Sequence, residues 1–139
     1  MKLIKKSSFI LWLILTGIIF TSCAKKDIHI DLTSHEWEVV KIRYDGESSY
    51  TKAEASYILT FTNENTYAIN LDVNQCFGSY EITGSGNIDI GQGGCTMICC
   101  DSKFAMQMLK LLPEMTSYYG QGDELTLEGE DGNIILKEK

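Results

Sequence analysis

The sequence is poor in the residues on which hydrolytic and nucleic-acid-binding sites usually depend. Its 139 residues include one proline, two histidines, and 12 lysines and arginines against 19 aspartates and glutamates, for a net charge of −7. A negative surface disfavours contact with phosphate backbones, so we expect no nucleic-acid partner. With so few histidines and no G-x-S-x-G segment, a hydrolytic nucleophile would lack a base. We therefore expect a protein that is not an enzyme and takes no cofactor.

Long hydrophobic runs are also absent. A membrane-spanning helix takes about 20 apolar residues, and the most apolar segment of this chain, residues 9–20, is shorter. Three lysines precede this segment within the first six residues. A basic start followed by a short apolar run is typical of a secretory signal peptide, which is removed from the mature protein.

The segment "TSC", which ends at Cys23, resembles the lipobox of bacterial lipoproteins, whose cysteine is lipidated and becomes the mature N-terminus. Phe20 departs from the leucine that is usual three places before that cysteine. Ala24, in place of an aspartate, resembles the pattern of lipoproteins that are sent to the outer membrane. The alternative is an ordinary signal peptide that is cut near Ala24.

These features predict three segments: a lipoprotein signal peptide (1–22), a lipidated tether (23–34) and a β-rich domain (35–139). The protein would then be attached to a membrane through its N-terminal lipid and would reside in the cell envelope, at the outer membrane. Since the surface is acidic, acyl chains rather than a basic patch would provide the attachment.

Four further cysteines follow Cys23, and exported chains with an even number of cysteines favour disulfides because their compartment is oxidising. They are Cys76, Cys95, Cys99 and Cys100. Adjacent cysteines can bridge each other only through a strained small ring, so a Cys99–Cys100 bond is disfavoured. In an extended strand Cys95 and Cys99 would lie about 13 Å apart, too far to bridge. The preferred assignment is Cys76–Cys99 with Cys95–Cys100, and the swapped pairing is its rival.

The same cluster allows two functional alternatives. A soft-metal site for zinc or copper could use Cys95, Met97, Cys99 and Cys100. A thiol-redox centre is the other alternative, because Cys100 lies just before a predicted helix, where a thiolate would be stabilised. Both are weakened by the absence of a C-x-x-C pair. Structural disulfides and no metal are therefore the favoured interpretation.

Periodicity predicts a mainly β domain with one α-helix. Residues 56–62 and 66–72 alternate apolar and polar positions around "NEN", which predicts an antiparallel hairpin. Residues 101–112 carry apolar side chains at helical spacing and are followed by Pro113. Further short strands are expected at 36–44, 76–83, 87–91, 95–99, 115–119, 124–128 and 133–137. We expect a small antiparallel sheet or partly open barrel of about eight strands wrapped on the helix.

The order of several segments resembles the META (HslJ-like) domain of bacterial envelope lipoproteins. The residues that carry the resemblance are an early Trp37, the Asn-x-x-x-Gly-x-Tyr pattern of Asn74, Gly78 and Tyr80, and Thr96 in "TMICC" before a helix. The resemblance covers about residues 35–138. Val73 stands where the family usually has a cysteine, so the family's disulfide pairing does not transfer unchanged.

The resemblance implies a β-rich domain without catalytic residues, in a lipoprotein with an interaction, stress or envelope-integrity role. A small periplasmic protein inhibitor is an alternative of the same design. Aromatic side chains of Phe77, Tyr80, Tyr118 and Tyr119 could be exposed for binding, although packing on the helix is favoured. A small apolar ligand would require an empty cavity inside the barrel.

Overall fold

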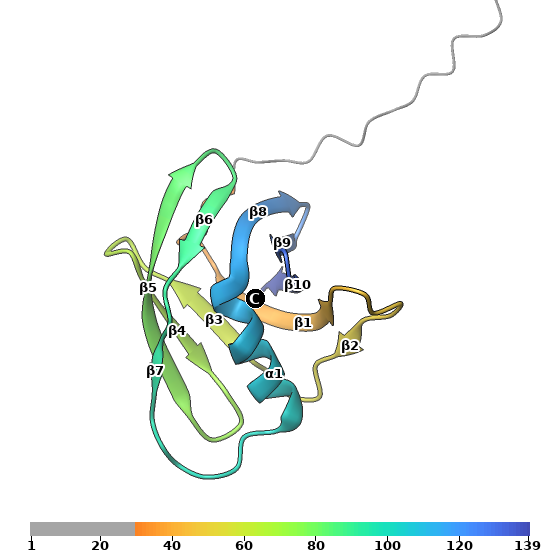
Figure 1. Cartoon of the computed structure of the whole chain (residues 1–139). Helices are drawn as coiled ribbons and strands as arrows, with labels where there is room; N and C mark the ends of the chain where they lie inside the picture. Colours follow the sequence, from red (N-terminus) through yellow and green to blue (C-terminus); the bar gives the residue numbers. More distant parts are fainter. Residues whose placement is uncertain (1–29) are drawn as a thin grey trace, which may run out of the picture.

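Ten strands and one α-helix make up residues 30–139, the part of the chain that the computed structural model describes (Figure 1). The predicted signal peptide, the lipidation site at Cys23 and most of the predicted tether lie outside these residues. The strands are β1 (Glu36–Tyr44), β2 (Thr51–Lys52), β3 (Ile58–Phe61), β4 (Thr66–Asn70), β5 (Gln75–Gly84), β6 (Asn87–Ile90), β7 (Gly94–Cys95), β8 (Met115–Gln121), β9 (Glu124–Gly129) and β10 (Gly132–Glu138). The helix is α1 (Lys103–Leu111), which continues into the 3-10 turn η1 (Leu112–Glu114).

Eight of the strands form a closed antiparallel barrel. Their order is β10-β9-β8-β6-β5-β4-β3-β1, and β10 pairs back with β1 to complete the ring. The two short strands β2 and β7 add to β1 and β5 respectively. The expected class, mainly β with one helix, is confirmed. The barrel is closed rather than partly open.

Strand periodicity places alternate side chains inside the barrel, because successive residues of a strand point to opposite faces. The hairpin of β3 and β4 forms as expected, with Leu59 paired with Ile69 and Phe61 paired with Tyr67. All four side chains are buried in one core cluster with residues of β1, β9, β10 and α1. Since side chains fill this interior, the hypothesis of an apolar ligand inside the barrel is wrong.

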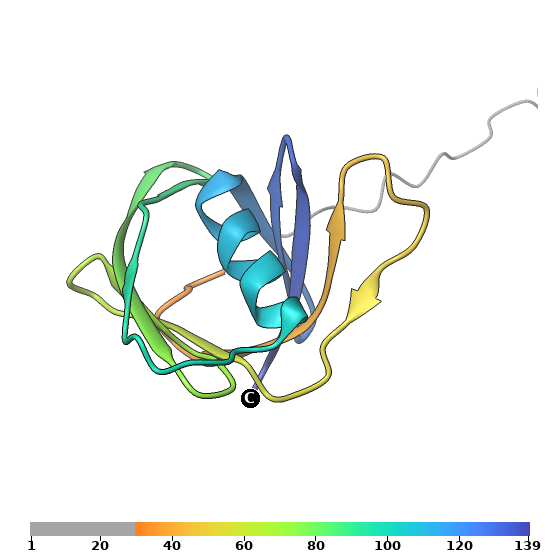
Figure 2. The ribbon, with the colours of Figure 1, turned by 60° about the horizontal axis from the view of Figure 1, so that its bottom comes forward.

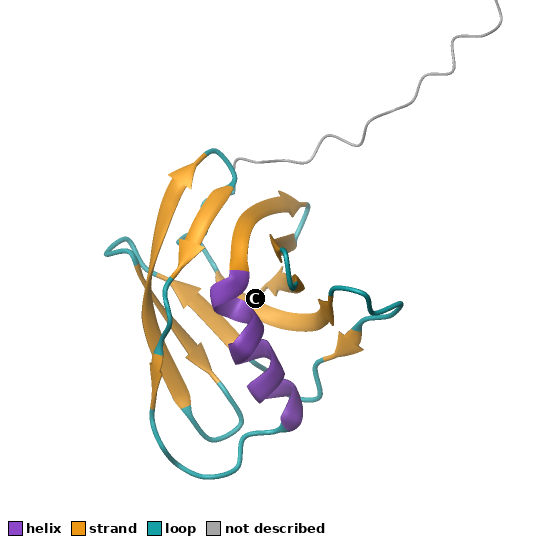
Figure 3. Ribbon diagram, in the orientation of Figure 1, coloured by secondary structure: helices purple, strands orange, loops and turns teal. Residues whose placement is uncertain are grey.

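The helix lies across the mouth of the barrel, with the strands arranged around it (Figures 2 and 3). Ser102 caps its N-terminus, since its side-chain oxygen accepts a hydrogen bond of 3.1 Å from the Ala105 N–H. The buried face carries Phe104, Ala105, Met108 and Leu111, at the spacing of one helical stripe. The helix therefore closes one end of the core with this face. Among residues 30–139 no helix has the length and apolar character needed to cross a membrane.

The packed domain begins before residue 35. Leu32 is buried and Ile30 packs against the core. The indole N–H of Trp37 donates a hydrogen bond of 2.9 Å to the Leu32 carbonyl. Trp37 is itself almost fully buried, so this bond satisfies a polar group that would otherwise lack a partner. Residues 30–34, which the sequence places in the tether, thus belong to the folded part.

Candidate functional site

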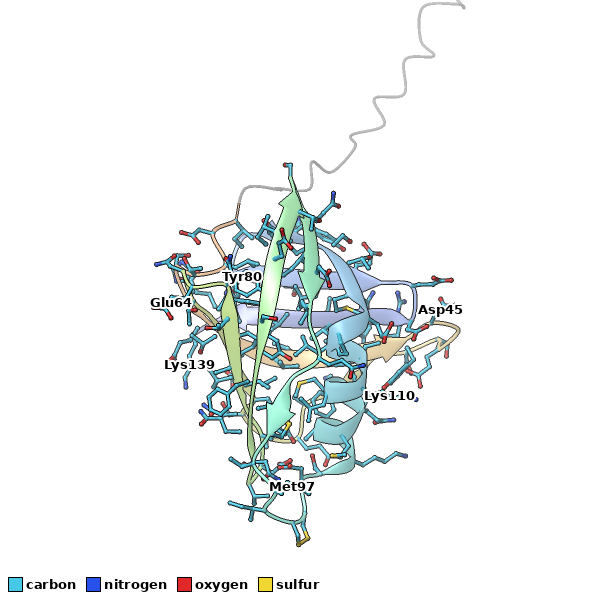
Figure 4. All side chains as sticks on the ribbon, turned by 60° about the vertical axis from the view of Figure 1, so that its left-hand side comes forward. Asp45, Glu64, Tyr80, Met97, Lys110 and Lys139 are labelled. Atoms are coloured by element: carbon cyan, nitrogen blue, oxygen red, sulfur yellow. A yellow bond between two sulfur atoms is a disulfide. The ribbon has the colours of Figure 1, made fainter. Side chains whose placement is uncertain are left out.

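The candidate site is the segment of residues 96–102, which we call the cysteine loop. It connects β7 to α1 and lies at the opposite end of the domain from the point where the described chain begins (Figure 4). Met97, at its tip, is 99% exposed, and Ile98 is 61% exposed. The strand expected over residues 95–99 ends at Cys95. The Thr96 N–H still donates to the Gln75 carbonyl of β5 at 3.0 Å, but the backbone of Ile98 is bonded to the side chain of Asn74 instead of to a strand.

One disulfide joins Cys76 to Cys95. The two residues face each other in the ladder between β5 and β7, so strand register brings their sulfur atoms together. Cys76 is buried in the core, whereas Cys95 lies at the surface. The bond has a sequence separation of 19 residues. Closing a chain segment of that length stabilises the folded state by about 3 kcal/mol in the chain-entropy description.

The second disulfide joins the adjacent residues Cys99 and Cys100, both of which are exposed. The preferred assignment of Cys76–Cys99 with Cys95–Cys100 is therefore wrong. Strand register places Cys95 opposite Cys76, so Cys99 and Cys100 bond to each other. The backbone of Cys100 adopts φ 89°, a left-handed conformation that residues other than glycine rarely adopt. The expectation that adjacent cysteines would not bridge is therefore also wrong, and the backbone bends at this bond.

Asn74 holds the base of the cysteine loop with its side-chain amide. Its Oδ1 accepts hydrogen bonds from the Ile98 N–H (2.8 Å) and the Thr96 hydroxyl (2.9 Å). Its Nδ2 donates to the Ile98 carbonyl (2.5 Å) and to a carboxylate oxygen of Asp101 (2.6 Å). The amide therefore serves both backbone groups of Ile98, as a neighbouring strand would. This explains why the loop is ordered without continuing β7.

Asp101 connects the cysteine loop to the turn between β4 and β5 in the opposite direction. Its Oδ1 accepts from the backbone N–H groups of Val73 (3.0 Å) and Asn74 (3.2 Å). Burial by itself would raise the pKa of Asp101, but the hydrogen bonds from Val73 and Asn74 outweigh it and lower the pKa below its ordinary value of 3.8. The ionised carboxylate is thus the form that holds the loop.

Asp72 ties the same turn to the start of α1. Its Oδ2 accepts from the Ser102 N–H at 2.9 Å, and its Oδ1 accepts from the Tyr57 hydroxyl at 3.0 Å. The hydrogen bond from the Ser102 backbone lowers the pKa of Asp72, and further bonds from the Ser102 and Tyr57 side chains act in the same direction. Burial, together with the nearby carboxylate of Asp72, raises the pKa of the Tyr57 hydroxyl. The helix cap, the turn and the core therefore meet in one network.

The family-pattern residues divide between this network and the barrel wall. Asn74 and Thr96 belong to the network, and the Thr96 hydroxyl also accepts from the Gln75 N–H at 3.1 Å. Gly78 lies under the Tyr67 ring, where a Cβ atom would come within 2.5 Å of a ring carbon. A side chain at Gly78 would therefore displace the ring from the core.

Tyr80, the last residue of the pattern, is a structural residue of the barrel. Its ring packs edge-on against Phe61 with centroids 4.8 Å apart, and its hydroxyl donates to the Thr62 carbonyl at 2.8 Å. Tyr118 is likewise buried, and Tyr119 is half-buried. Phe77 differs from these residues because it is 50% exposed on the outside of β5.

The thiols that the metal and redox alternatives would use are oxidised in this structure. Cys95 is bonded to Cys76, away from the Cys99–Cys100 pair. Within residues 30–139 no three side chains of histidine, cysteine, aspartate or glutamate come together in a way that could hold a metal ion. A four-sulfur set of Cys95, Met97, Cys99 and Cys100 would require both bonds to be reduced.

Asp72, Tyr57 and Asp101 are not predicted from the sequence as parts of the site. Asp72 lies in a turn directly after an apolar alternation, which is a common place for a solvated aspartate. Nothing in its spacing indicates that it meets Ser102, because the two are 30 residues apart.

A closed antiparallel barrel with a helix across its mouth, and with an Asn-x-x-x-Gly-x-Tyr segment beside a cysteine loop, defines a class of small β domains. This chain belongs to the META domain family, whose match extends over residues 30–139. No curated protein matches the sequence significantly.

Two solved structures share the fold. One is an NMR structure of a protein from Burkholderia xenovorans, with a TM-score of 0.62 and 16% identity over 78% of this chain and 83% of the other. The second is a crystal structure of a duf4847 family protein from Bacteroides vulgatus, with a TM-score of 0.58 and 14% identity over 78% of this chain and 94% of the other. At such identities the likeness concerns the fold alone.

Replacing Asn74 with alanine should loosen the cysteine loop. The Asn74→Ala substitution removes four hydrogen bonds around a half-exposed side chain, and we expect a loss of about 1–2 kcal/mol in the free energy of unfolding. Denaturant unfolding measures this loss, and amide hydrogen exchange should show faster exchange at Ile98. The matched control is Gln75→Ala, which removes one exposed bond to Asn70 and should change stability by less than about 0.5 kcal/mol. Equal losses in both variants would contradict the role given to Asn74.

Acid should weaken the same network. Since the pKa values of Asp72 and Asp101 are lowered in the folded state, their contribution is complete above the unfolded pKa of about 4 and is lost as pH falls through the folded pKa values. Thermal unfolding followed from pH 7 to pH 2 should show a fall in midpoint that begins below about pH 4. Asp101→Asn should lower the midpoint at pH 7 and flatten the acid loss, whereas Asp89→Asn, at an exposed position of β6, should do neither. A midpoint that rises on acidification would overturn this assignment.

Proposed function

We propose that the chain is a non-catalytic lipoprotein of the cell envelope, anchored through Cys23, whose META domain presents the cysteine loop to another envelope protein. The observation that carries the proposal is the exposure of apolar side chains on a loop whose base is held by hydrogen bonds. Met97 and Ile98 of the loop are 99% and 61% exposed, and Val73 of the adjoining turn between β4 and β5 is 47% exposed. Exposed apolar side chains that gather in one place are typical of protein interaction sites.

The ordered base of the loop supports binding in a second way. A loop that is already held in one conformation loses less conformational entropy when it binds, and this improves affinity. Asn74, Asp72 and Asp101 provide that order from the turn between β4 and β5. An inhibitor of a periplasmic enzyme is the second candidate, since an exposed loop with a fixed base also suits insertion into a partner's cleft.

The place where the described residues begin is compatible with anchoring. Ile30 packs beside β8, against Gly120, and Met97 lies at the other end of the domain (Figure 4). A lipid on Cys23 would therefore attach to the end of the domain that does not carry the cysteine loop. The loop would remain accessible to a partner while the protein is held at the membrane.

Lipid anchoring is tested by the substitution Cys23→Ser. The unmodified protein should fractionate with outer membranes and should show the intact mass of a triacylated chain that begins at Cys23. The variant should lose the acyl mass and appear in the soluble periplasmic fraction. Soluble, unacylated protein from the unmodified chain would refute the anchor and would favour a signal peptide cut near Ala24.

Contact through the cysteine loop is tested by site-specific photo-crosslinking in intact cells. A photoreactive residue at position 97 should give one discrete adduct, and the same residue in place of Asp45, which is exposed on another face, should give none. Combining the label at position 97 with Asn74→Ala should weaken the adduct at least about fivefold if the loop geometry is what binds. Adducts of equal yield from positions 45 and 97 would argue against a specific surface. Identification of the adduct by mass spectrometry separates an enzyme partner from a structural one.

A further inference from the structure

The two disulfides differ in what happens to their sulfur atoms when the bond opens. Breaking Cys76–Cys95 must release or attack a sulfur at Cys76, which is only 1% exposed. A thiolate that leaves into apolar surroundings is unfavourable, and the core blocks approach to that sulfur. The β5–β7 ladder also holds the two residues opposite each other after reduction. This bond is therefore protected by the fold.

The Cys99–Cys100 bond has none of this protection. Both residues are exposed, so an incoming thiolate can reach either sulfur and the other can leave into water. The bond spans a single peptide unit and pairs no strands, so the barrel and its core do not depend on it. Opening this bond would leave the rest of the domain unchanged.

The backbone favours opening of the same bond. Cys100 is held at φ 89°, and only this residue and Asn65 among the non-glycine residues of the described chain have a positive φ. Once the small ring opens, Cys100 is free to return to an ordinary conformation, which favours the reduced state.

The residues on either side of the pair remain fixed. Ile98 is bonded through both its N–H and its carbonyl to Asn74, and the Asp101 carboxylate is bonded to the turn before β5. Motion on reduction is thereby confined to Cys99 and Cys100. The two thiols stay adjacent, so the bond can also form again without refolding.

From these contrasts we propose that Cys99–Cys100 is a thiol–disulfide exchange site, which an exported dithiol oxidoreductase reduces while Cys76–Cys95 stays intact. A thiolate of the reductant attacks one sulfur of the pair and forms a mixed disulfide. The other cysteine leaves as a thiolate and takes up a proton. The second thiol of the reductant then attacks the reductant's first sulfur in the mixed disulfide and releases the remaining cysteine of the pair as a thiol. Two electrons pass to the pair, and the reductant becomes a disulfide.

The exposed Met97 and Ile98 give this reductant an apolar contact directly before the pair. This site goes beyond the proposed interaction role. Exchange requires only that the reductant reaches the sulfur atoms, and it does not require the domain to bind another envelope protein. A failed search for a binding partner would leave it standing, and a failed exchange would leave the interaction proposal standing.

The first measurement is differential reduction of the purified, folded protein. Dithiothreitol is added in graded amounts without denaturant, thiols are blocked with iodoacetamide, and peptide mapping assigns each label, including any on Cys23. Cys99 and Cys100 should be labelled at least about tenfold faster than Cys76 and Cys95. Equal rates, earlier labelling of Cys76 and Cys95, or a Cys76–Cys99 link in the unreduced protein would overturn the proposal.

A trapping experiment distinguishes exchange from mere lability. A thioredoxin-type reductant whose second cysteine is replaced by serine should accumulate as a mixed disulfide on Cys99 or Cys100. The matched control is the double variant Cys99→Ser, Cys100→Ser, which should lose the adduct and the fast labelling yet keep the slow labelling and its unfolding midpoint. Absence of an adduct on the unmodified protein, or an adduct that persists in the double variant, would refute the exchange site.

Discussion

The pairing of the first strand with the last one is the contact on which the rest of this domain depends. β1 and β10 are paired from Trp37 opposite Glu138 to Tyr44 opposite Gly132, with an irregularity between Val39 and Lys41. Without this seam the sheet would have two long exposed edges, which proteins avoid because such edges pair with other chains. The helix would also have no ring to close. Barrel closure therefore determines both the shape of the core and the place where α1 can lie.

A closed ring also brings the turn between β4 and β5 against the segment that leads into α1. Asn74 and Asp101 connect the two by hydrogen bonds that run in both directions, and Asp72 adds the helix cap. The cysteine loop itself adds little to the core, since Met97 and Ile98 face solvent. Polar side chains thus hold the loop against the end of the core formed by Tyr57, Leu71, Cys76 and Phe104. An ordered base with an exposed apolar tip is the result, and this combination suits a surface that meets another molecule.

The two disulfides have different relations to the fold. Cys76–Cys95 joins paired strands and partly lies in the core, so it stabilises the barrel. Cys99–Cys100 joins neighbours in the chain and contributes nothing to the connection between elements. The domain thus needs only the first for stability. The second bond is available for chemistry at the surface. The same protein thus carries one structural disulfide and one exchangeable disulfide.

Local patterns in the sequence were sufficient to predict the class of fold, the β3–β4 hairpin, the helix with its buried stripe and the likeness to META domains through Trp37, Asn74, Gly78 and Tyr80. These features depend on residues close together in the chain, whose spacing directly reflects strand or helix geometry. Only the tertiary structure decided barrel closure, the burial of Leu32 beneath Trp37 and the disulfide partners. Each of these depends on register between distant segments: Cys76 meets Cys95 because β7 pairs with β5, and Asn74 reaches Ile98 because a turn folds against a loop. Periodicity within a segment carries no information about such register, so the sequence by itself could name the four cysteines but could not pair them.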